Sequence, residues 1–177
     1  MPRITLREAW VRYTVNMKIA ILSDIHDNLA RLEEALIICR HEKLDTCICC
    51  GDIGQMETLQ ALADNFRHVY LALGNADFGL INKTGLFPEN VTWSEEVLEE
   101  EIDGQRIAIV HHDYKAKELA NTNRFDLIFY GHTHTPWEKK INKTIILNPG
   151  EIAGQFGKAS FAIFDTNIMK ATLKILN

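Results

Sequence analysis

Six short apolar runs, each closed at once by polar residues, constrain the fold of this chain more than any other feature. Their sequences are KIAIL, TCICC, VYLAL, RIAIV, LIFY and TIIL, and they begin at Lys18, Thr46, Val69, Arg106, Leu127 and Thr144. Apolar runs of this length that end at Gly, Asp or Asn are typical of buried β-strands. Each run therefore predicts one strand inside a sheet.

The first three runs alternate with two segments of helical periodicity, residues 29–40 and 56–66. In both segments apolar residues recur every three or four positions, and Asn28 stands where a helix cap is expected. Alternating strands and helices favour a parallel sheet with the helices outside it.

Strand-like segments dominate the later part of the chain. Residues 97–102 and 106–110 flank Asp103-Gly104, a dipeptide that favours a tight hairpin. Further strands are predicted at residues 137–141, 144–147, 159–164 and 171–175. This pattern favours antiparallel pairing, so the chain as a whole is predicted to form a mixed α/β sandwich.

Three further segments lie outside the predicted strands and the two helical segments above. A short helix is expected at residues 115–122, and residues 78–94 are expected to be irregular because they are rich in Gly, Asn and Pro. Residues 1–16 fit nothing that follows, whereas Met17 would be a natural start for the first strand. We predict an N-terminal extension at 1–16, from an upstream start codon or as a peripheral element, and one domain at 17–177.

The composition excludes several classes of protein. The chain has 177 residues, of which 46% are hydrophobic and 24% charged, so it can form a core without disulfides. The net charge of −5 provides no general basic field, and no nucleic-acid-binding surface is predicted. No run approaches the roughly 18–20 apolar residues of a membrane span. Residues 1–16 also lack the continuous apolar stretch of a secretory signal.

The cysteines indicate a reducing environment. Three of the four, Cys47, Cys49 and Cys50, lie in one apolar run, which is unlike a disulfide framework. We interpret them as small residues that fill a strand rather than as metal ligands. With no secretory signal, this favours a cytoplasmic location.

Five of the apolar runs lead directly to side chains that can bind metal ions. These are Asp24 and His26; Asp52; Asn75 and Asp77; His111, His112 and Asp113; and His132 and His134. Ligands of α/β sheets bind beyond the carboxyl ends of the strands, so these side chains are expected to meet. In an extended segment, residues two apart point to the same side, so Asp24 and His26 are expected to reach one site, and likewise His132 and His134.

The donor set indicates transition metals. Imidazole, carboxylate and one amide, without thiolate, suit Mn²⁺, Fe, Zn²⁺, Ni²⁺ or Co²⁺ and argue against a site made for Ca²⁺ or Mg²⁺. The number of candidate ligands is larger than a structural zinc site uses. It suits two ions about 3.5–4 Å apart that are bridged by a carboxylate. The sequence has no P-loop, HExxH or serine-centred elbow motif.

The motifs DxH at Asp24, GD at Gly51, GNxD at Gly74, the histidine at His111 and GHTH at Gly131 resemble, in this order, the calcineurin-like metallophosphoesterase superfamily. The resemblance runs from Met17 to the C-terminus and is strongest to the small prokaryotic YfcE-type phosphodiesterases. It implies a four-layer α/β/β/α sandwich with two mixed β-sheets.

The resemblance also implies roles for the motif residues. Asp24, His26 and His134 would hold one divalent ion, Asn75, His111 and His132 the other, and Asp52 would bridge them. Manganese is favoured, with nickel, iron, zinc and cobalt as alternatives. A metal-bridging water would attack a small phosphoester, most specifically a phosphodiester, with Asn75, His111 and Asp52 contributing to catalysis. Asn28 and Asn75 would help to position the phosphate.

The sequence departs from the family pattern in three places. Gln55 replaces a second carboxylate, Ala76 stands where larger phosphatases have a histidine that assists the leaving group, and His112-Asp113 replaces Gly-His. The general acid is therefore open. Asp77, Asp113 and His112 are candidates either for that role or for orienting metal-bound histidines. Weak acid assistance would favour good leaving groups, which is consistent with diesters.

The sequence leaves two alternative hypotheses for the function. The superfamily includes a retromer subunit that serves as a non-catalytic protein-binding scaffold, although its site is degenerate and this one is filled. A metallo-β-lactamase type of hydrolase would need an HxHxDH block, which is absent. His41 and His68 are predicted to be surface residues, and the natural substrate and assembly into a homo-oligomer are left undetermined.

Overall fold

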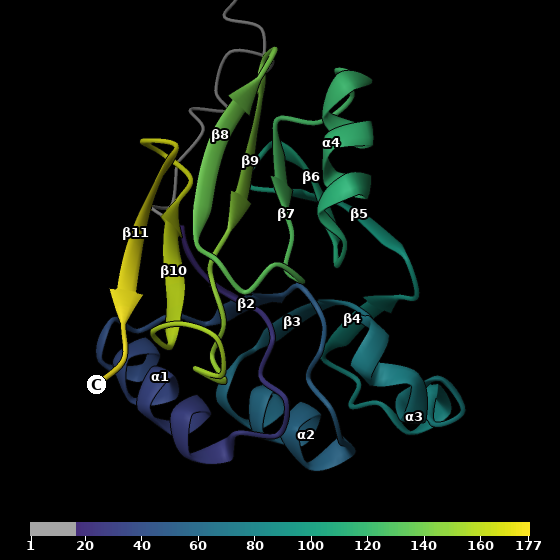
Figure 1. Cartoon of the computed structure of the whole chain (residues 1–177), viewed down its shortest axis with the longest axis vertical. Helices are drawn as coiled ribbons and strands as arrows, with labels where there is room; N and C mark the ends of the chain where they lie inside the picture. The colour runs from purple at the N-terminus through teal and green to yellow at the C-terminus, as the bar shows by residue number, and fades with distance from the viewer. Residues whose placement is uncertain (1–16) are drawn as a thin grey trace, which may run out of the picture.

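The computed structural model describes residues 17–177, so the prediction of an extension at 1–16 lies outside the described residues. Two mixed β-sheets form the centre of this part of the chain (Figure 1). The first has the order β11 (Lys170–Ile175), β10 (Ser160–Asp165), β1 (Lys18–Leu22), β2 (Thr46–Cys49), β3 (His68–Ala72) and β4 (Val91–Ser94). The second has the order β5 (Val97–Ile102), β6 (Gln105–Val110), β7 (Leu127–Phe129), β9 (Thr144–Asn148) and β8 (Trp137–Ile141).

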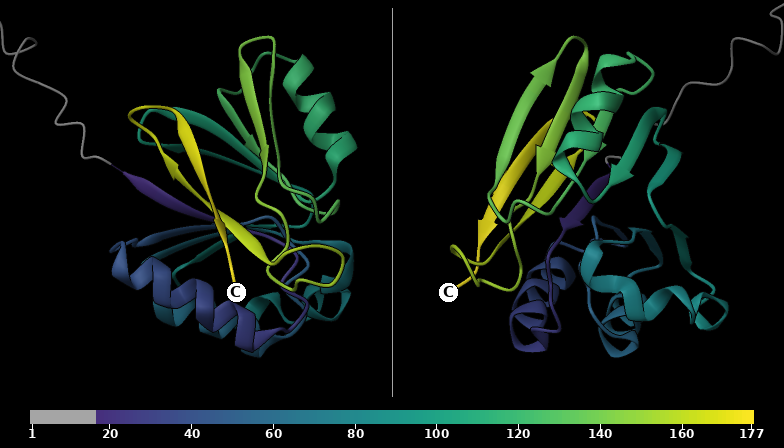
Figure 2. Two further views of the ribbon diagram at one scale, coloured as in Figure 1. Left: turned by 60° about the vertical axis from the view of Figure 1, so that its left-hand side comes forward. Right: turned by 45° about the vertical axis from the view of Figure 1, so that its right-hand side comes forward.

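Two helices, α1 (Leu29–His41) and α2 (Met56–Asn65), cover the outer face of the first sheet (Figure 2, left). Alternate strand residues such as Leu22 and Leu71 point toward them and pack against helix residues such as Leu32. Burying one such leucine contributes about 1.5–3 kcal/mol, so the apolar face of each helix fixes it on the sheet.

The other face of the first sheet packs on the second sheet. Ile21, Ile48 and Phe164 from the first sheet join Ile109 and Phe129 from the second in one buried cluster. The rings of Phe129 and Phe164 meet edge to face, with centroids 5.5 Å apart. Strands buried on both faces explain why the runs in the sequence are continuously apolar.

Helix α4 (Asp113–Asn121) covers the outer face of the second sheet, where Ala116 and Ala120 pack against Val110 and Ile128. The layers are therefore helix, sheet, sheet and helix, as Figure 2 shows. The predicted α/β/β/α sandwich is confirmed.

The structure corrects three local predictions. Strands β6, β7 and β9 pair in parallel, although the later part was expected to be antiparallel. The segment 78–94 contains a short helix, α3 (Phe78–Ile81), a 3₁₀ turn at Thr84–Leu86 and strand β4, although it was expected to be irregular. Helix α4 begins at Asp113 rather than 115. The β5–β6 hairpin at Asp103-Gly104 is confirmed.

Cys47, Cys49 and Cys50 are buried and free, as predicted for small residues that fill a strand, and Cys39 in α1 is also buried and free. Cys47 and Cys49 face the helices, and Cys50 faces the second sheet. Burial raises the pKa of the Cys39 thiol to about 12, so it remains protonated and inert at neutral pH.

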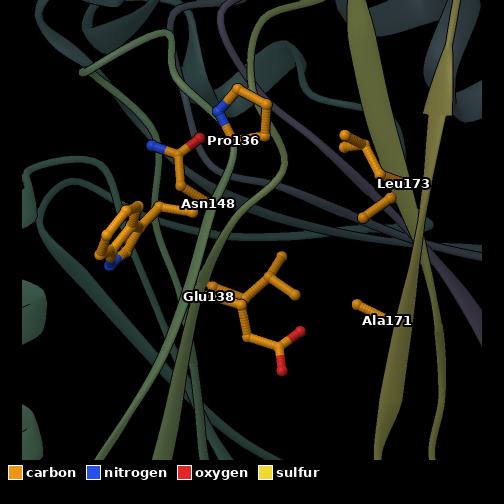
Figure 3. A pocket seen from close by; sticks show the side chains of 8 residues that line it. Pro136, Glu138, Asn148, Ala171 and Leu173 are labelled. Atoms are coloured by element: carbon orange, nitrogen blue, oxygen red, sulfur yellow. The ribbon is translucent and has the colours of Figure 1, made fainter.

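Strand β11 is an edge of the first sheet, and β8 is an edge of the second. A hollow of about 220 Å³ lies between them, lined by residues that include Pro136, Glu138, Ala171 and Leu173 (Figure 3). Within residues 17–177, no helix has the length and apolar character needed to cross a membrane.

Candidate metal centre

The candidate ligands lie in loops that follow parallel strands of both sheets and are tied together by backbone hydrogen bonds. Asp24 N–H donates to Gly51 C=O at 3.0 Å, and His26 N–H donates to Asp52 C=O at 2.9 Å. The N–H of His132, from the second sheet, donates to Asp24 Oδ2 at 3.1 Å. The carboxyl ends of the two sheets therefore meet at one site, as the sequence predicted.

Five of the seven candidate ligands have a left-handed backbone. Asp24, His26, Asp52, His132 and His134 have φ between 47° and 68°. This conformation is uncommon for residues with a side chain and carries a cost in free energy, and such residues gather at functional sites. The extended backbone predicted for Asp24 with His26, and for His132 with His134, was wrong, since all four residues have a left-handed backbone.

Glycines allow the close approach of the loops. Gly51 has φ of +94°, and a Cβ there would lie 2.7 Å from Gly74 N and 2.8 Å from His111 Nδ1. A Cβ at Gly74 would lie 2.5 Å from Asp52 N. A side chain at either position would push the candidate ligands apart, which explains glycine in the GD and GN motifs.

Asp24, His26 and His134 form the first cluster, with ligand atoms all within 4.8 Å of one another. His134 Nδ1 lies 2.8 Å from the carboxylate of Glu151, so Nδ1–H donates to it. In the neutral ring this leaves a lone pair on Nε2, which lies 3.4 Å from Asp24 Oδ1. The rings of His26 and His134 are stacked, with centroids 5.3 Å apart.

Asn75, His111 and His132 form the second cluster. Asn75 Oδ1 lies 3.0 Å from His111 Nε2 and 3.1 Å from His132 Nδ1. His111 Nδ1–H donates to the C=O of Cys50 at 2.8 Å, so Nε2 carries the lone pair in the neutral ring. A ring nitrogen lone pair and an amide oxygen therefore face each other in this cluster.

Asp52 lies between the two clusters. Its Oδ1 is 3.4 Å from His111 Nε2, and its Oδ2 is 3.6 Å from His26 Nε2. Oδ1 also accepts the N–H of Ala76 at 2.7 Å. The two oxygens of one buried carboxylate thus face different clusters, which is the geometry that a bridging ligand requires.

The donor atoms and the buried carboxylates of the site suit divalent cations. Lone pairs converge in both clusters, and His26 Nε2 is buried without a hydrogen-bond partner in residues 17–177. Burial raises the pKa of Asp24 to about 6 and lowers the pKa of His111 to about 4. A cation would offset the cost of burying the ionised Asp24 carboxylate. It would also take the neutral His111 ring as a ligand.

Asp77 is fully buried and binds backbone rather than histidine. Its carboxylate accepts the N–H groups of Asp52 at 2.8 Å, Ile53 at 2.8 Å, Gly54 at 2.9 Å and Gly74 at 2.8 Å. Burial raises its pKa, although these hydrogen bonds oppose the rise. It therefore holds the loop that presents Asp52 and does not face the opening.

The other two candidates for the acid role lie on the β6–α4 side. The carboxylate of Asp113 accepts a hydrogen bond from Lys117 Nζ at 2.6 Å on the surface of α4. The ring of His112 lies 4.6 Å from that of His132, and His111, His112 and His132 form a further group whose ligand atoms lie within 4.8 Å of one another. His112 thus borders the second cluster, whereas the Asp113 carboxylate is hydrogen-bonded to Lys117.

Asn28 uses both of its polar atoms within the protein. Its Oδ1 accepts the N–H of Arg31 at 3.2 Å and caps α1, and its Nδ2 donates to Ala153 C=O at 3.0 Å. The cap is confirmed, and contact with phosphate stays a prediction. The neighbouring Asp27, which the sequence did not single out, accepts the N–H of Gln55 at 2.8 Å and so binds the start of α2.

A hollow of about 180 Å³ lies beside the second cluster and is lined by residues that include Asn75, His111, His112, Tyr114 and Lys115. Tyr114 is exposed, and its ring lies 5.3 Å from that of His112. This hollow offers space for a substituent of a ligand bound at the centre.

Comparison with known proteins identifies the family. Residues 17–169 match the calcineurin-like phosphoesterase superfamily domain. The chain belongs to the calcineurin-like phosphoesterase superfamily. The predicted resemblance is therefore confirmed.

Named relatives support the smaller subgroup as well. The chain is 29% identical to phosphodiesterase MJ0936 of Methanocaldococcus jannaschii, over 85% of this chain and 93% of that protein. It is 25% identical to phosphodiesterase YfcE of Escherichia coli, over 86% and 90%. A solved structure described as a novel archaeal phosphodiesterase superposes with a TM-score of 0.81 at 27% identity, covering 90% of this chain and all of that one.

The fold also occurs outside the named phosphodiesterases. Vacuolar protein sorting 29 of Cryptosporidium parvum superposes with a TM-score of 0.67, over 91% of this chain and 97% of that one. At 18% identity this likeness shows the fold alone, so it gives the scaffold alternative little support.

Proposed function

We propose that this protein is a metal-dependent phosphodiesterase with two divalent ions at the candidate metal centre. The observation that carries the proposal is the position of Asp52, whose two carboxylate oxygens face two separate clusters of nitrogen and oxygen donors. Family membership and the phosphodiesterase names of the relatives support the same activity.

The two clusters would each hold one ion. Asp24, His26 and His134 form the first position, and Asn75, His111 and His132 form the second, with Asp52 shared. When bound, the ions supply Lewis acidity that activates water and neutralises charge on the phosphoryl oxygens. We favour manganese because the donors are nitrogen and oxygen without thiolate, and nickel, iron, zinc or cobalt would suit the same set.

The protein itself orients these donors. Glu151 holds the His134 ring and Cys50 C=O holds the His111 ring, each through Nδ1, so both rings aim Nε2 inward. Asp77 fixes the backbone of Asp52. A ligand set fixed in this way needs little rearrangement when ions and substrate bind.

The substrate is proposed to be a small phosphodiester with a good leaving group. Ala76 offers no proton at the position after Asn75, and Asp77 is buried behind the loop. Among the proposed acid candidates, only His112 borders the second cluster. We therefore expect diesters with activated leaving groups to react faster than monoesters or alkyl diesters.

We also propose a cytoplasmic location.

Hydrolysis of bis(p-nitrophenyl) phosphate tests this function. Metal-free protein would be loaded with Mn²⁺, Ni²⁺, Zn²⁺, Co²⁺ or Fe²⁺, and bound metal would be measured in the same samples. The wild type is expected to turn over, while Asp52→Asn and His132→Ala lose turnover but remain folded. His41→Ala is the control, since His41 lies exposed at the end of α1. Folded wild-type protein that binds metal but turns over no phosphoester would refute the proposal.

A further inference from the structure

Glu151 is a buried carboxylate that fixes two parts of the molecule at once. Its side chain is 0% exposed. Oε2 lies 2.8 Å from His134 Nδ1 and accepts the N–H of Gln155 at 2.9 Å. Oε1 accepts the N–H groups of Phe156 at 2.7 Å and Gly157 at 2.6 Å. One carboxylate therefore fixes both a proposed metal-binding ring and the loop that follows.

This loop presents an aromatic ring beside the metal centre. The side chain of Phe156 is 80% exposed, yet its ring centroid lies 4.8 Å from that of His134, with the two planes at 82°. Small-molecule sites combine aromatic surfaces of this kind with a few fixed polar groups. The ring is therefore placed to contact a ligand bound at the first cluster.

We propose that Phe156 forms an aromatic wall of the substrate site and favours phosphodiesters whose retained ester carries a flat aromatic ring, either an aryl group or a nucleobase. The proposal rests on the phosphodiesterase function proposed above. Glu151 is the positioning residue, because it fixes His134 and the backbone of residues 155–157 together. Within the described residues, no other carboxylate hydrogen-bonds to both a proposed ligand histidine and this loop.

The expected selectivity follows from the geometry. In the proposed arrangement, a phosphoryl group between the clusters would have one ester oxygen on the side of His134, and the substituent on that oxygen would contact the exposed ring of Phe156. Contact between two aromatic rings is expected to favour an aromatic over a methyl substituent by about three- to tenfold. The leaving group would then lie toward the hollow that Tyr114 lines beside the second cluster.

Three diesters with a common p-nitrophenyl leaving group test the wall. The other ester is methyl, phenyl or thymidine 5′, so the bond that breaks is the same in all three. The manganese-loaded wild type is expected to favour phenyl or thymidine over methyl in kcat/KM by about three- to tenfold, mainly through KM. Phe156→Ala should bring this ratio close to one, and Phe156→Trp should preserve it. Preference for phenyl alone would indicate aryl esters, and preference for thymidine alone would indicate nucleotides.

A matched control is available at the far end of the first sheet. Ile168, also exposed, lies in the turn between β10 and β11, and Lys18 pairs with Asp165 next to that turn. Ile168→Ala removes a comparable apolar side chain away from the metal centre and should leave the ratio unchanged. A wild type without aromatic preference, or a preference that survives Phe156→Ala, would overturn the proposal.

A binding measurement separates this proposal from the proposed function. Phenylphosphonate and methylphosphonate are not hydrolysed, and calorimetry gives their relative affinities for the manganese-loaded protein. The wild type should favour phenylphosphonate, and Phe156→Ala should not. If this difference is present but no diester is hydrolysed, the proposed function is wrong and the proposed role of Phe156 is supported. If diesters are hydrolysed but the protein shows no preference for phenylphosphonate, the proposed role of Phe156 is wrong.

The role of Glu151 has its own readout in metal affinity. Glu151→Gln should weaken Mn²⁺ binding by about 10–100-fold, as loss of a ligand-orienting partner does, and should also reduce the phenyl preference. Phe156→Ala should reduce the preference and leave Mn²⁺ affinity near that of the wild type. Glu151→Asp, which keeps the charge on a shorter side chain, should show the same paired loss to a smaller degree. Unchanged Mn²⁺ affinity and preference in folded Glu151→Gln would contradict the positioning role.

Discussion

The carboxylate of Asp77 accepts the backbone N–H of Asp52 at 2.8 Å, although the two residues are 25 positions apart. This contact joins the loop after β3 to the loop after β2. It explains a carboxylate in the GNxD motif without assigning it a proton transfer, and it gives the loop that presents Asp52 a buried side-chain partner in addition to its backbone hydrogen bonds.

Replacement of Asp77 separates positioning from acid catalysis. Asp77→Asn places an NH₂ group against backbone donors, so the free energy of unfolding should fall by about 1–3 kcal/mol. Metal affinity and turnover should fall as well. The ratio of rates for good and poor leaving groups should not change, because the side chain does not face the substrate. That ratio is measured with p-nitrophenyl and alkyl leaving groups.

Asp113→Asn is the matched control for Asp77→Asn. Its carboxylate pairs with Lys117 on the surface of α4, where such pairs contribute about 0–1 kcal/mol. We expect little change in stability or metal affinity. A selective slowing of poor leaving groups by Asp77→Asn would instead identify Asp77 as the general acid.

The glycine of the GN motif provides a second prediction. Gly74→Ala would place a Cβ 2.5 Å from Asp52 N and 2.9 Å from His111 Cε1, so it should weaken both stability and metal binding. Gly79→Ala, in α3, meets no heavy atom within 4 Å and should be neutral or stabilising by up to about 1 kcal/mol. Urea unfolding and metal titration of both variants measure the difference. Equal behaviour of the two would refute the close packing of the loops.

The pH dependence of the metal-free protein gives a third prediction. Burial raises the pKa of Asp24 to about 6, above its value of about 3.9 in the unfolded chain. Between these values the folded state keeps a proton that the unfolded state releases, so this residue lowers stability as pH rises. Asp24→Asn removes that loss and should stabilise the protein by up to about 2–3 kcal/mol above pH 6, and hardly at all below pH 4.

His111 has the opposite effect on the pH dependence of stability. Burial lowers its pKa to about 4, from about 6.5 in the unfolded chain, so it contributes stability that increases as pH rises through this interval. The two effects oppose each other in the wild type, and Asp24→Asn should therefore show the steeper rise with pH. Urea unfolding with a chelator from pH 4 to 7.5 measures both curves. A difference between them that is constant over this range would contradict the raised pKa of Asp24.

Metal binding should stabilise the protein because the unfolded chain has no assembled site. At a metal concentration 100 times the Kd, the free energy of unfolding should rise by about 2.7 kcal/mol for each such site. Asp52→Asn should show a smaller rise, since Asp52 is shared by both proposed positions. Thermal unfolding at increasing Mn²⁺ measures this effect, and an unchanged midpoint in the wild type would argue against specific binding.

The sequence predicted the layers of the fold because strands buried on both faces are continuous apolar runs, such as KIAIL and LIFY. It missed β4, whose sequence VTWS is short and half exposed and follows a Gly- and Pro-rich segment. It also missed the parallel pairing of β7 with β9, because the return of the chain past β8 is a property of the tertiary structure.

The candidate metal centre could be located because its side chains directly follow predicted strands. The partners that orient them could not. Glu151 follows Asn-Pro-Gly, which indicates only a turn, and its contact with His134 depends on the packing of two loops. Likewise, neither Asp77 nor Asp113 reveals from its motif alone whether it faces backbone, lysine or histidine.

We propose that this protein requires two ions, which share Asp52, to hydrolyse a phosphodiester. Turnover of bis(p-nitrophenyl) phosphate, measured against the number of Mn²⁺ ions bound per chain, tests it most directly. Turnover is expected to rise steeply only as the second ion binds, and Asp52→Asn is expected to stay inactive throughout. Full turnover with one bound ion per chain, or none with two, would contradict it.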